Sequence, residues 1–213
     1  MIGLLLNLLI IIRLEYEKMS SNYQTLSYVT IESDTTYLRP AQNFTENVTA
    51  ESPAIDVMTD FTKIAAITMG PCGTLDAAEK RMIASGVRLL LVVDQSNQTL
   101  GVITLTDLQG SRPMKYLQEA GGTREDIFLR DIMTKSNQIE ALPMKVVELS
   151  RVGDIIATMK QSNRQHALVI DQNEGNQQVI RGIFSTKQIS IQLGLDYRAK
   201  ETREIFEDLE AIL

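Results

Sequence analysis

"RLLLVVDQSNQTLGVITLTDL", residues 88–108, contains two apolar runs separated by a short polar turn. The first run, residues 89–93, has the length and the continuous apolar character of a buried strand. The turn is rich in Gln, Ser and Asn, and the second run ends at Thr104, where a helical pattern begins. The stretch therefore predicts a buried β-hairpin that is followed directly by a helix.

The same order of features occurs a second time along the chain. "QHALVID", residues 165–171, matches the first run, and "RGIFSTKQI", residues 181–189, matches the stretch that begins at Leu100. The two copies are offset by 77 residues through their middle and by 81 residues after a longer turn in the second copy. A period of this length is too long for a solenoid and suits two small domains.

Each copy starts with a Met-Thr pair, Met58–Thr59 or Met133–Thr134. A short strand follows, over residues 64–68 or 138–142, and then an amphipathic helix. Thr74 and Ser150 suit the starts of the two helices. The expected apolar helix faces consist of Leu75, Ala78, Met82 and Ile83 in the first copy and Val152, Ile155, Ile156 and Met159 in the second.

The predicted unit is thus strand, helix, strand, strand, helix, which is an α+β arrangement. A unit of roughly 60 residues is marginal alone, so we expect the two sheets to bury their faces against each other. The repeats divide the chain into the following segments: 1–52, a flexible N-terminal arm; 53–112, the first repeat; 113–126, a linker helix; 127–194, the second repeat; and 195–213, a C-terminal helix.

The apolar N-terminal stretch, residues 1–18, is too short to span a bilayer, which needs roughly 20 apolar residues. It also has no cleavage site of the kind that a secretory signal carries. The composition changes at residues 13–19, and we expect translation to start at Met19 rather than at Met1.

Composition excludes several classes of function. The 213 residues carry a net charge of −6, and no basic face for nucleic acid is visible. The single cysteine, Cys72, allows no disulfide within the chain and no zinc cluster, and it fits a reducing cytoplasm. The single histidine, His166, precedes a strand pattern rather than a catalytic loop. The sequence therefore predicts neither an enzyme nor a metal or cofactor site.

The sequence Thr104-Leu-Thr-Asp107 has two interpretations. A Thr followed three residues later by an acid resembles a capping box, which would only start a helix. A short carboxylate at a helix start can also accept two hydroxyl donors of a ligand, next to backbone N–H groups that favour a phosphate. Ser185 and Gln188 occupy the equivalent positions of the second copy without the carboxylate.

The repeated combination of "DVMT" and "DIMT", "GVRLLLVVD" and "QHALVID", and "GVITLTD" and "GIFSTKQ" resembles the tandem CBS (cystathionine β-synthase) domain pair, or Bateman module. The resemblance covers about residues 53–194. It implies two repeats packed as a pseudo-twofold pair that itself dimerises. Many members of the family bind AMP, ADP, ATP or S-adenosylmethionine between the repeats.

The resemblance also implies a set of ligand-binding residues. Asp107 would accept hydrogen bonds from ribose, with Thr104 beside it. Basic residues six and five positions before the strand-ending Asp would meet phosphate, which points to Arg88 and His166. Lys187, two residues after Ser185, would reach across to the same phosphate. Gln188 replaces the ribose Asp in the second copy, so we expect at most one good site per chain.

The resulting expectation is a cytoplasmic regulatory protein that binds AMP or ADP in preference to ATP or S-adenosylmethionine. Its signal would be a rearrangement of the repeats or of a homodimer, passed to a protein partner that the sequence does not identify. The alternative is a ligand-free scaffold that only dimerises and presents its terminal helix. Neither a nucleic acid nor a membrane is expected as a partner.

Overall fold

The computed structural model describes residues 26–33, 35–36, 42–195, 204 and 207–209. The predicted segment 1–18 lies outside the described residues. The chain divides into two units, Met1–Arg39 and Pro40–Leu213. The described residues of the first unit are exposed and form no helix or strand.

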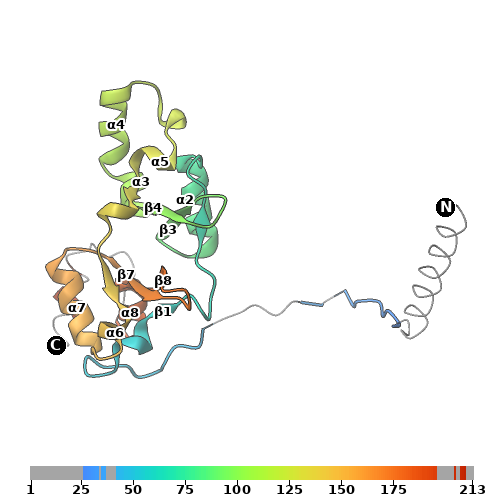
Figure 1. Ribbon diagram of the computed structural model, residues 1–213, viewed down its shortest axis with the longest axis vertical. Helices are drawn as coiled ribbons and strands as arrows, with labels where there is room; N and C mark the ends of the chain where they lie inside the picture. Colours follow the sequence, from blue (N-terminus) through green and yellow to red (C-terminus); the bar gives the residue numbers. More distant parts are fainter. Residues whose placement is uncertain (1–25, 34, 37–41, 196–203, 205–206, 210–213) are drawn as a thin grey trace, which may run out of the picture. The chain divides into compact units, whose positions relative to one another are not determined.

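The second unit contains two four-stranded sheets, one for each repeat (Figure 1). The first sheet has the order β2-β3-β4-β5, and the second has the order β1-β8-β7-β6. The strands of the first sheet are β2 (Thr68–Met69), β3 (Leu89–Val93), β4 (Thr99–Thr104) and β5 (Thr134–Lys135). Those of the second are β1 (Thr59–Asp60), β6 (Ala141–Pro143), β7 (His166–Gln172) and β8 (Gln178–Ser185).

The helices complete the predicted order in both copies. The first repeat contains α2 (Leu75–Ser85) and α3 (Leu105–Gln109), and the second contains α6 (Met144–Val147), α7 (Val152–Gln161) and α8 (Thr186–Gln192). The start of the first repeat contains η1 (Ala54–Val57). The segment between the repeats contains α4 (Arg112–Ala120) and η2 (Arg124–Asp126), and the start of the second repeat contains α5 (Leu129–Ile132) and η3 (Ser136–Gln138). The α+β fold and the strand-helix-strand-strand-helix order of each repeat are confirmed.

The two repeats exchange their leading strands. β1 lies at the start of the first repeat in sequence but pairs with β8 of the second, whereas β5 lies at the start of the second repeat but pairs with β4 of the first. The glycines that the two copies share permit this pairing. A Cβ on Gly101 would lie 2.3 Å from the Thr134 carbonyl oxygen, and one on Gly182 would lie 2.5 Å from that of Thr59. Each position must therefore be glycine for the exchanged strand to lie against it.

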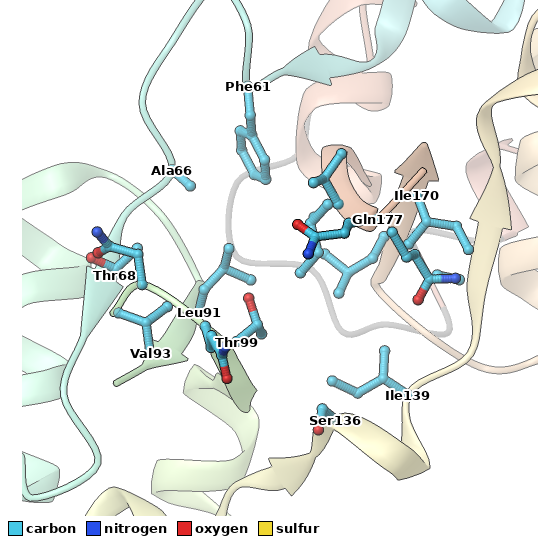
Figure 2. Close-up of a pocket in the computed structure, with 17 residues that line it drawn as sticks. Phe61, Ala66, Thr68, Leu91, Val93, Thr99, Ser136, Ile139, Ile170 and Gln177 are labelled. Carbon is cyan, nitrogen blue, oxygen red and sulfur yellow. The ribbon is translucent and has the colours of Figure 1, made fainter. Parts of the chain in front are cut away.

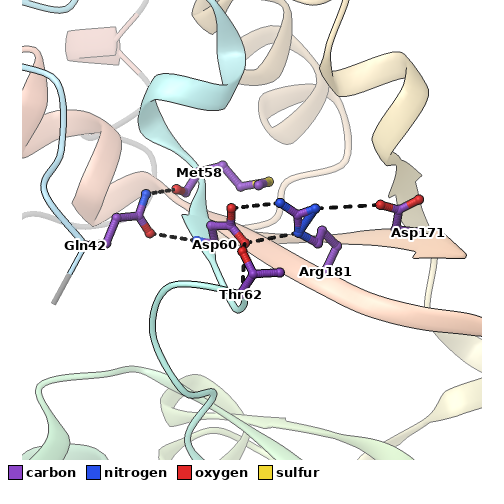
Figure 3. A network of polar contacts seen from close by, with 6 residues as sticks. All are labelled: Gln42, Met58, Asp60, Thr62, Asp171 and Arg181. Atoms are coloured by element: carbon purple, nitrogen blue, oxygen red, sulfur yellow. Dashed lines mark hydrogen bonds and ion pairs between the residues drawn. The ribbon is translucent and has the colours of Figure 1, made fainter. Parts of the chain in front are cut away.

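A buried ion pair fixes β1 to its host sheet (Figure 3). Arg181 on β8 donates from Nε and a terminal nitrogen to the two carboxylate oxygens of Asp60, at 3.1 and 2.9 Å. Thr62 donates its backbone N–H and its hydroxyl to Oδ1 of the same carboxylate, at 2.9 and 2.7 Å. Burial would raise the pKa of Asp60, but these hydrogen bonds and the charge of Arg181 outweigh it and hold the pKa below its usual value.

Three groups of buried side chains form the core. One lies in the first repeat and includes residues of α5, and another lies in the second repeat and includes residues of η1. The exchange therefore extends beyond the strands to the segments that precede them. The third group joins the two sheets through Leu91, Val102 and Leu168. Burial between the sheets supplies the stability that a single repeat of this size lacks.

Two local predictions are wrong. Ile83 was expected on the buried face of α2, but its side chain is 72% exposed. The buried residues of α2 are Leu75, Ala78 and Met82. Ser150 does not cap α7, which begins after Arg151; the Ser150 hydroxyl donates to the Val146 carbonyl instead. Thr74 caps α2 as predicted, accepting from the Ala77 N–H at 3.3 Å.

The C-terminal segment is helical where it is described. Leu209 is fully buried in the second-repeat core, and Leu195 packs against the same core. Both residues therefore contribute to the core of the second repeat. The rest of the predicted C-terminal helix, apart from residues 204, 207 and 208, lies outside the described residues.

Candidate functional site

Two equivalent clefts lie between the repeats, and each combines parts of both. The Asp107 cleft joins the start of α3, from the first repeat, to residues 138–140 and 163–166 of the second, and its volume is about 480 Å³. The Lys187 cleft joins the start of α8, from the second repeat, to residues 64–67 and 85–89 of the first, and its volume is about 400 Å³. Both volumes lie in the range of small-molecule sites.

Strand register explains why the two clefts are equivalent. Leu89 pairs with Thr104 in the first repeat, and His166 pairs with Ser185 in the second. The first residue of α3, Leu105, donates its N–H to the carbonyl of Arg88, which precedes β3. In the second repeat Thr186 of α8 donates in the same way to the carbonyl of Gln165, which precedes β7. The polar helix starts and the strand starts therefore lie together at one end of the seam between the sheets.

The Asp107 carboxylate forms the predicted capping box. Its Oδ2 accepts from the backbone N–H of Thr104 at 2.9 Å and from the Thr104 hydroxyl at 2.7 Å. The Thr104 oxygen in turn accepts from the Asp107 N–H at 3.2 Å. The capping interpretation is confirmed, and it leaves Oδ1 as the carboxylate oxygen not used by Thr104.

Arg112 occupies that remaining oxygen, and the sequence analysis missed it. Its Nε lies 3.0 Å from Asp107 Oδ1, and the Asp107 side chain is only 14% exposed. A terminal nitrogen of Arg112 also donates to the Ile132 carbonyl at 2.9 Å and to the Thr134 hydroxyl at 3.0 Å. Arg112 thus ties the start of α4 to Asp107 and to β5. Ribose hydroxyls could use both Asp107 oxygens only by replacing these contacts.

The Lys187 cleft has positive charge character. Arg88 and Lys187 line it, and no Asp or Glu is found among the described residues of its wall. The Lys187 ammonium group donates to the Gly86 carbonyl at 3.3 Å, across the seam between the repeats. An apolar part of the wall is formed by residues 64–67. A flat apolar ring that carries an anionic group would fit both parts of this wall.

The helix start in the Lys187 cleft is capped without a carboxylate. Ser185 accepts from the Gln188 N–H at 3.2 Å, as Thr104 does in the first repeat. The Gln188 amide donates to the Gln192 side chain at 3.1 Å. Ribose would therefore meet a hydroxyl and an amide here, which are weaker acceptors than a carboxylate.

His166 lines both clefts. Burial, and to a smaller extent the charge of Arg88, lower its pKa to about 4, while the charge of Asp107 acts in the opposite direction. His166 is therefore neutral at pH 7. It contributes hydrogen-bonding capacity rather than positive charge to a ligand in either cleft.

The structure distributes the six predicted site residues over two clefts. Thr104 and Asp107 line one, Arg88, Ser185 and Lys187 line the other, and His166 belongs to both. The clefts therefore do not bring Arg88 and Lys187 to a nucleotide that is held by Asp107. The reason is that each helix start faces the strand start of the other repeat.

A further ion pair in the Asp107 cleft was not predicted. Arg164 lies 2.7 Å from the Glu140 carboxylate at the cleft rim. Both residues come from the second repeat, and their side chains are 45% and 81% exposed, so the pair adds little stability. Together with Arg112, it gives this cleft balanced charge, whereas the Lys187 cleft is positive.

The described residues contain no group of three His, Cys, Asp or Glu side chains able to hold a metal ion. None of the helices formed by them has the length and apolar character required to cross a membrane.

The family model of the CBS domain matches residues 73–111. The matched segment contains α2, the β3–β4 hairpin and α3, so it includes the Thr104–Asp107 box and Arg88. The resemblance to the CBS domain is confirmed. No curated protein matches the chain.

Three solved structures of similar fold are compared with this chain by sequence identity, by the share of each chain covered and by TM-score. An uncharacterized conserved protein from Pyrococcus horikoshii is 20% identical, with 71% of this chain and 97% of that chain covered and a TM-score of 0.49. A CBS-domain containing protein from Agrobacterium tumefaciens is 20% identical, with 59% and 87% covered and a TM-score of 0.44. The CBS-pair protein CBSX2 from Arabidopsis thaliana is 19% identical, with 67% and 94% covered and a TM-score of 0.45; it has also been solved in complex with AMP.

Proposed function

Because the chain carries a CBS domain within a fold of two equivalent repeats, we propose that it is a regulatory protein that binds an adenine nucleotide between them. AMP or ADP is the proposed ligand, ahead of ATP or S-adenosylmethionine. No catalytic step, metal or cofactor is part of the proposal. The alternative remains a ligand-free scaffold that dimerises and presents its helices.

One observation carries the proposal: the Lys187 cleft joins an apolar wall to two cationic side chains in an acidic protein. Residues 64–67 supply the apolar wall that a purine ring requires. Arg88 and Lys187 supply the positive charge that a phosphate requires, next to the N–H groups at the start of α8. We therefore propose the Lys187 cleft, rather than the cleft of Asp107, as the phosphate site.

The number of charges favours a short phosphate chain. His166 is neutral at pH 7, so Arg88 and Lys187 supply the positive charge among the residues that line the Lys187 cleft. Two cations can balance the charge of AMP and most of that of ADP, whereas ATP would leave more of its charge unbalanced. AMP is therefore the first ligand to test.

The same geometry suggests how binding could be signalled. A nucleotide in the Lys187 cleft would contact both repeats, so it would bind most tightly to one arrangement of the two. Ligand would then shift the population towards that arrangement. We propose that a homodimer in the cytoplasm passes this change to a protein partner.

Thermal and calorimetric titration of the full chain with AMP, ADP, ATP and S-adenosylmethionine tests the proposal. A ligand at 100 times its dissociation constant should add about 2.7 kcal/mol to the free energy of unfolding. Lys187→Ala should weaken AMP binding about tenfold, which is the loss of roughly 1.4 kcal/mol from a charged hydrogen bond. Lys115→Ala, at an exposed position of α4, is the matched control.

The variants also locate the site. Equal loss of AMP binding in Asp107→Ala, with Lys187→Ala unaffected, would move the site to the Asp107 cleft. No binding of any of the four compounds to the wild-type chain would favour the scaffold. Retained AMP binding in both single variants would place the nucleotide outside both clefts.

A further inference from the structure

A third pocket lies at the other end of the seam, between the β3–β4 and β7–β8 hairpins, and has a volume of about 790 Å³. We call it the axial pocket. Figure 2 shows side chains of the two repeats facing each other across it, with Leu91, Val93 and Thr99 on one side and Ile139 and Ile170 on the other. The ring of Phe61 points into the space between them.

The register of the strands places this pocket on the pseudo-twofold axis. Thr68 pairs with Leu91 in the first sheet, as Ala141 pairs with Leu168 in the second. Val93 pairs with Thr99, as Ile170 pairs with Ile180. Each of these residues lines the axial pocket together with its equivalent. The Asp107 and Lys187 clefts are exchanged by the same axis, whereas the axial pocket is mapped onto itself.

The chemistry of the axial pocket differs from that of both clefts. None of its lining residues is Asp, Glu, Lys, Arg or His. Its two walls are aliphatic, apart from hydroxyls such as that of Thr68. The amide side chains of Asn97, Gln98, Gln177 and Gln178 stand at its exposed rim. An ionic ligand would be desolvated here without a counter-charge, which is unfavourable by several kcal/mol.

We propose that the axial pocket is a separate binding site for an uncharged molecule built on a flat ring. The ring lies between the aliphatic walls and against Phe61, and its polar edge meets the amides at the rim. A slot with apolar walls and a few polar groups is the usual composition of a small-molecule site, and its volume is within the usual range. The ligand contacts both repeats at equivalent positions.

The walls of the axial pocket are shared with the two clefts. Phe61, Ala66 and Leu91 also line the Lys187 cleft. Ile139 and Leu168 also line the Asp107 cleft. A ligand in the axial pocket therefore influences how the two sheets lie against each other, as a ligand in either cleft does. It does not compete for the charged groups of the two clefts.

The uncharged naphthalene dye Prodan is a suitable probe, because its emission shifts to shorter wavelength in apolar surroundings. The full-length chain should bind Prodan saturably with one site per chain. Thr99→Trp, which fills the slot, should weaken binding at least tenfold. Gln95→Trp, in the same turn but outside the pocket lining, should change it less than twofold. Gln98→Trp, at the exposed rim, is a second blocking variant that spares the strand.

Competition and the cleft variant complete the test. The sulfonated dye ANS should not displace Prodan, because its charge is excluded, and Lys187→Ala should bind Prodan as the wild type does. Absence of saturable Prodan binding would overturn the proposal. So would wild-type affinity in both blocking variants, or displacement by ANS. These results do not depend on whether a nucleotide binds in the clefts.

Discussion

The Nε atom of Arg112 lies 3.0 Å from Oδ1 of Asp107, so an arginine of the linker helix holds the carboxylate that the CBS resemblance assigns to ribose. Thr104 holds the other oxygen. Contacts within the chain therefore compete with ribose for both oxygens of Asp107. Its counterpart at Gln188 has no such contact with an arginine in the described structure.

Arg112→Ala should increase the affinity for adenosine in the Asp107 cleft. Adenosine has ribose hydroxyls but no phosphate, so the loss of the arginine removes the competing partner of Asp107, together with its hydrogen bonds to Ile132 and Thr134. A partly exposed ion pair contributes roughly 0.2–1 kcal/mol, which predicts an increase of about 1.4- to fivefold. Isothermal titration measures it, with Lys115→Ala as the control on the same helix. Weaker adenosine binding would show that Arg112 assists the ligand instead.

Gly101→Ala and Gly182→Ala should both destabilise the pair of repeats. The added Cβ would lie 2.3 or 2.5 Å from a carbonyl oxygen of the exchanged strand, which forces that strand away. Overpacking of this kind lowers the free energy of unfolding by roughly 1–3 kcal/mol. Gly70→Ala is the matched control, because nothing lies within 4 Å of its added Cβ. Urea unfolding of the three variants should separate the first two from the third.

Asp60→Asn should lower the free energy of unfolding at neutral pH by about 3 kcal/mol, because it leaves Arg181 without its buried partner. The folded-state pKa of Asp60 is below its usual value, so its contribution is present above pH 4 and is lost as the pH falls through that lowered pKa. The variant should lack this part of the acid dependence. Asp76→Asn, which breaks an exposed pair with Lys80, should change stability by less than about 0.5 kcal/mol.

Titration of His166 should make the free energy of unfolding depend on pH in a second range, at milder acidity than the titration of Asp60 does. Its pKa is about 4 in the folded chain and 6.5 in a free side chain, so the unfolded chain gains a proton first as the pH falls. The stability contribution is present above pH 6.5 and is lost between pH 6.5 and 4. Chemical unfolding at pH 7.5 and pH 5 should differ by about 2 kcal/mol from this group alone.

His166→Asn isolates that contribution, because asparagine does not titrate. The difference between pH 7.5 and pH 5 should shrink by about the same 2 kcal/mol in the variant. An unchanged pH dependence would mean that His166 is as accessible to protons in the folded chain as in the unfolded one.

Local sequence patterns predicted the elements of this fold well. The hairpins around residues 94 and 171, the helix face of α7 and the Thr104–Asp107 box all depend on neighbouring residues, which the sequence displays directly. The exchange of β1 and β5 depends on pairing across the chain, and two-residue strands carry no sign of their partner. The repeated glycines at 101 and 182 were the only visible trace of it.

The sequence pointed to residues that line the two clefts, but it did not predict which of these residues share a cleft. The family resemblance implied that Arg88 and Asp107, which belong to the same hairpin and helix start, serve one ligand. The crossing of the repeats sends them to different clefts. Arg112 was missed because the linker helix had no counterpart in the second repeat and hence no repeat signal.

The exchange of leading segments means that the boundaries of the repeats in sequence are not their boundaries in space. A fragment cut at residues 53 and 112 would carry away a strand of the other sheet and leave behind β5, which closes its own. Two such fragments made separately would each expose an unpaired sheet edge and a gap in the core until they met. Only a piece that contains both repeats, from η1 to α8, keeps every strand of both sheets paired.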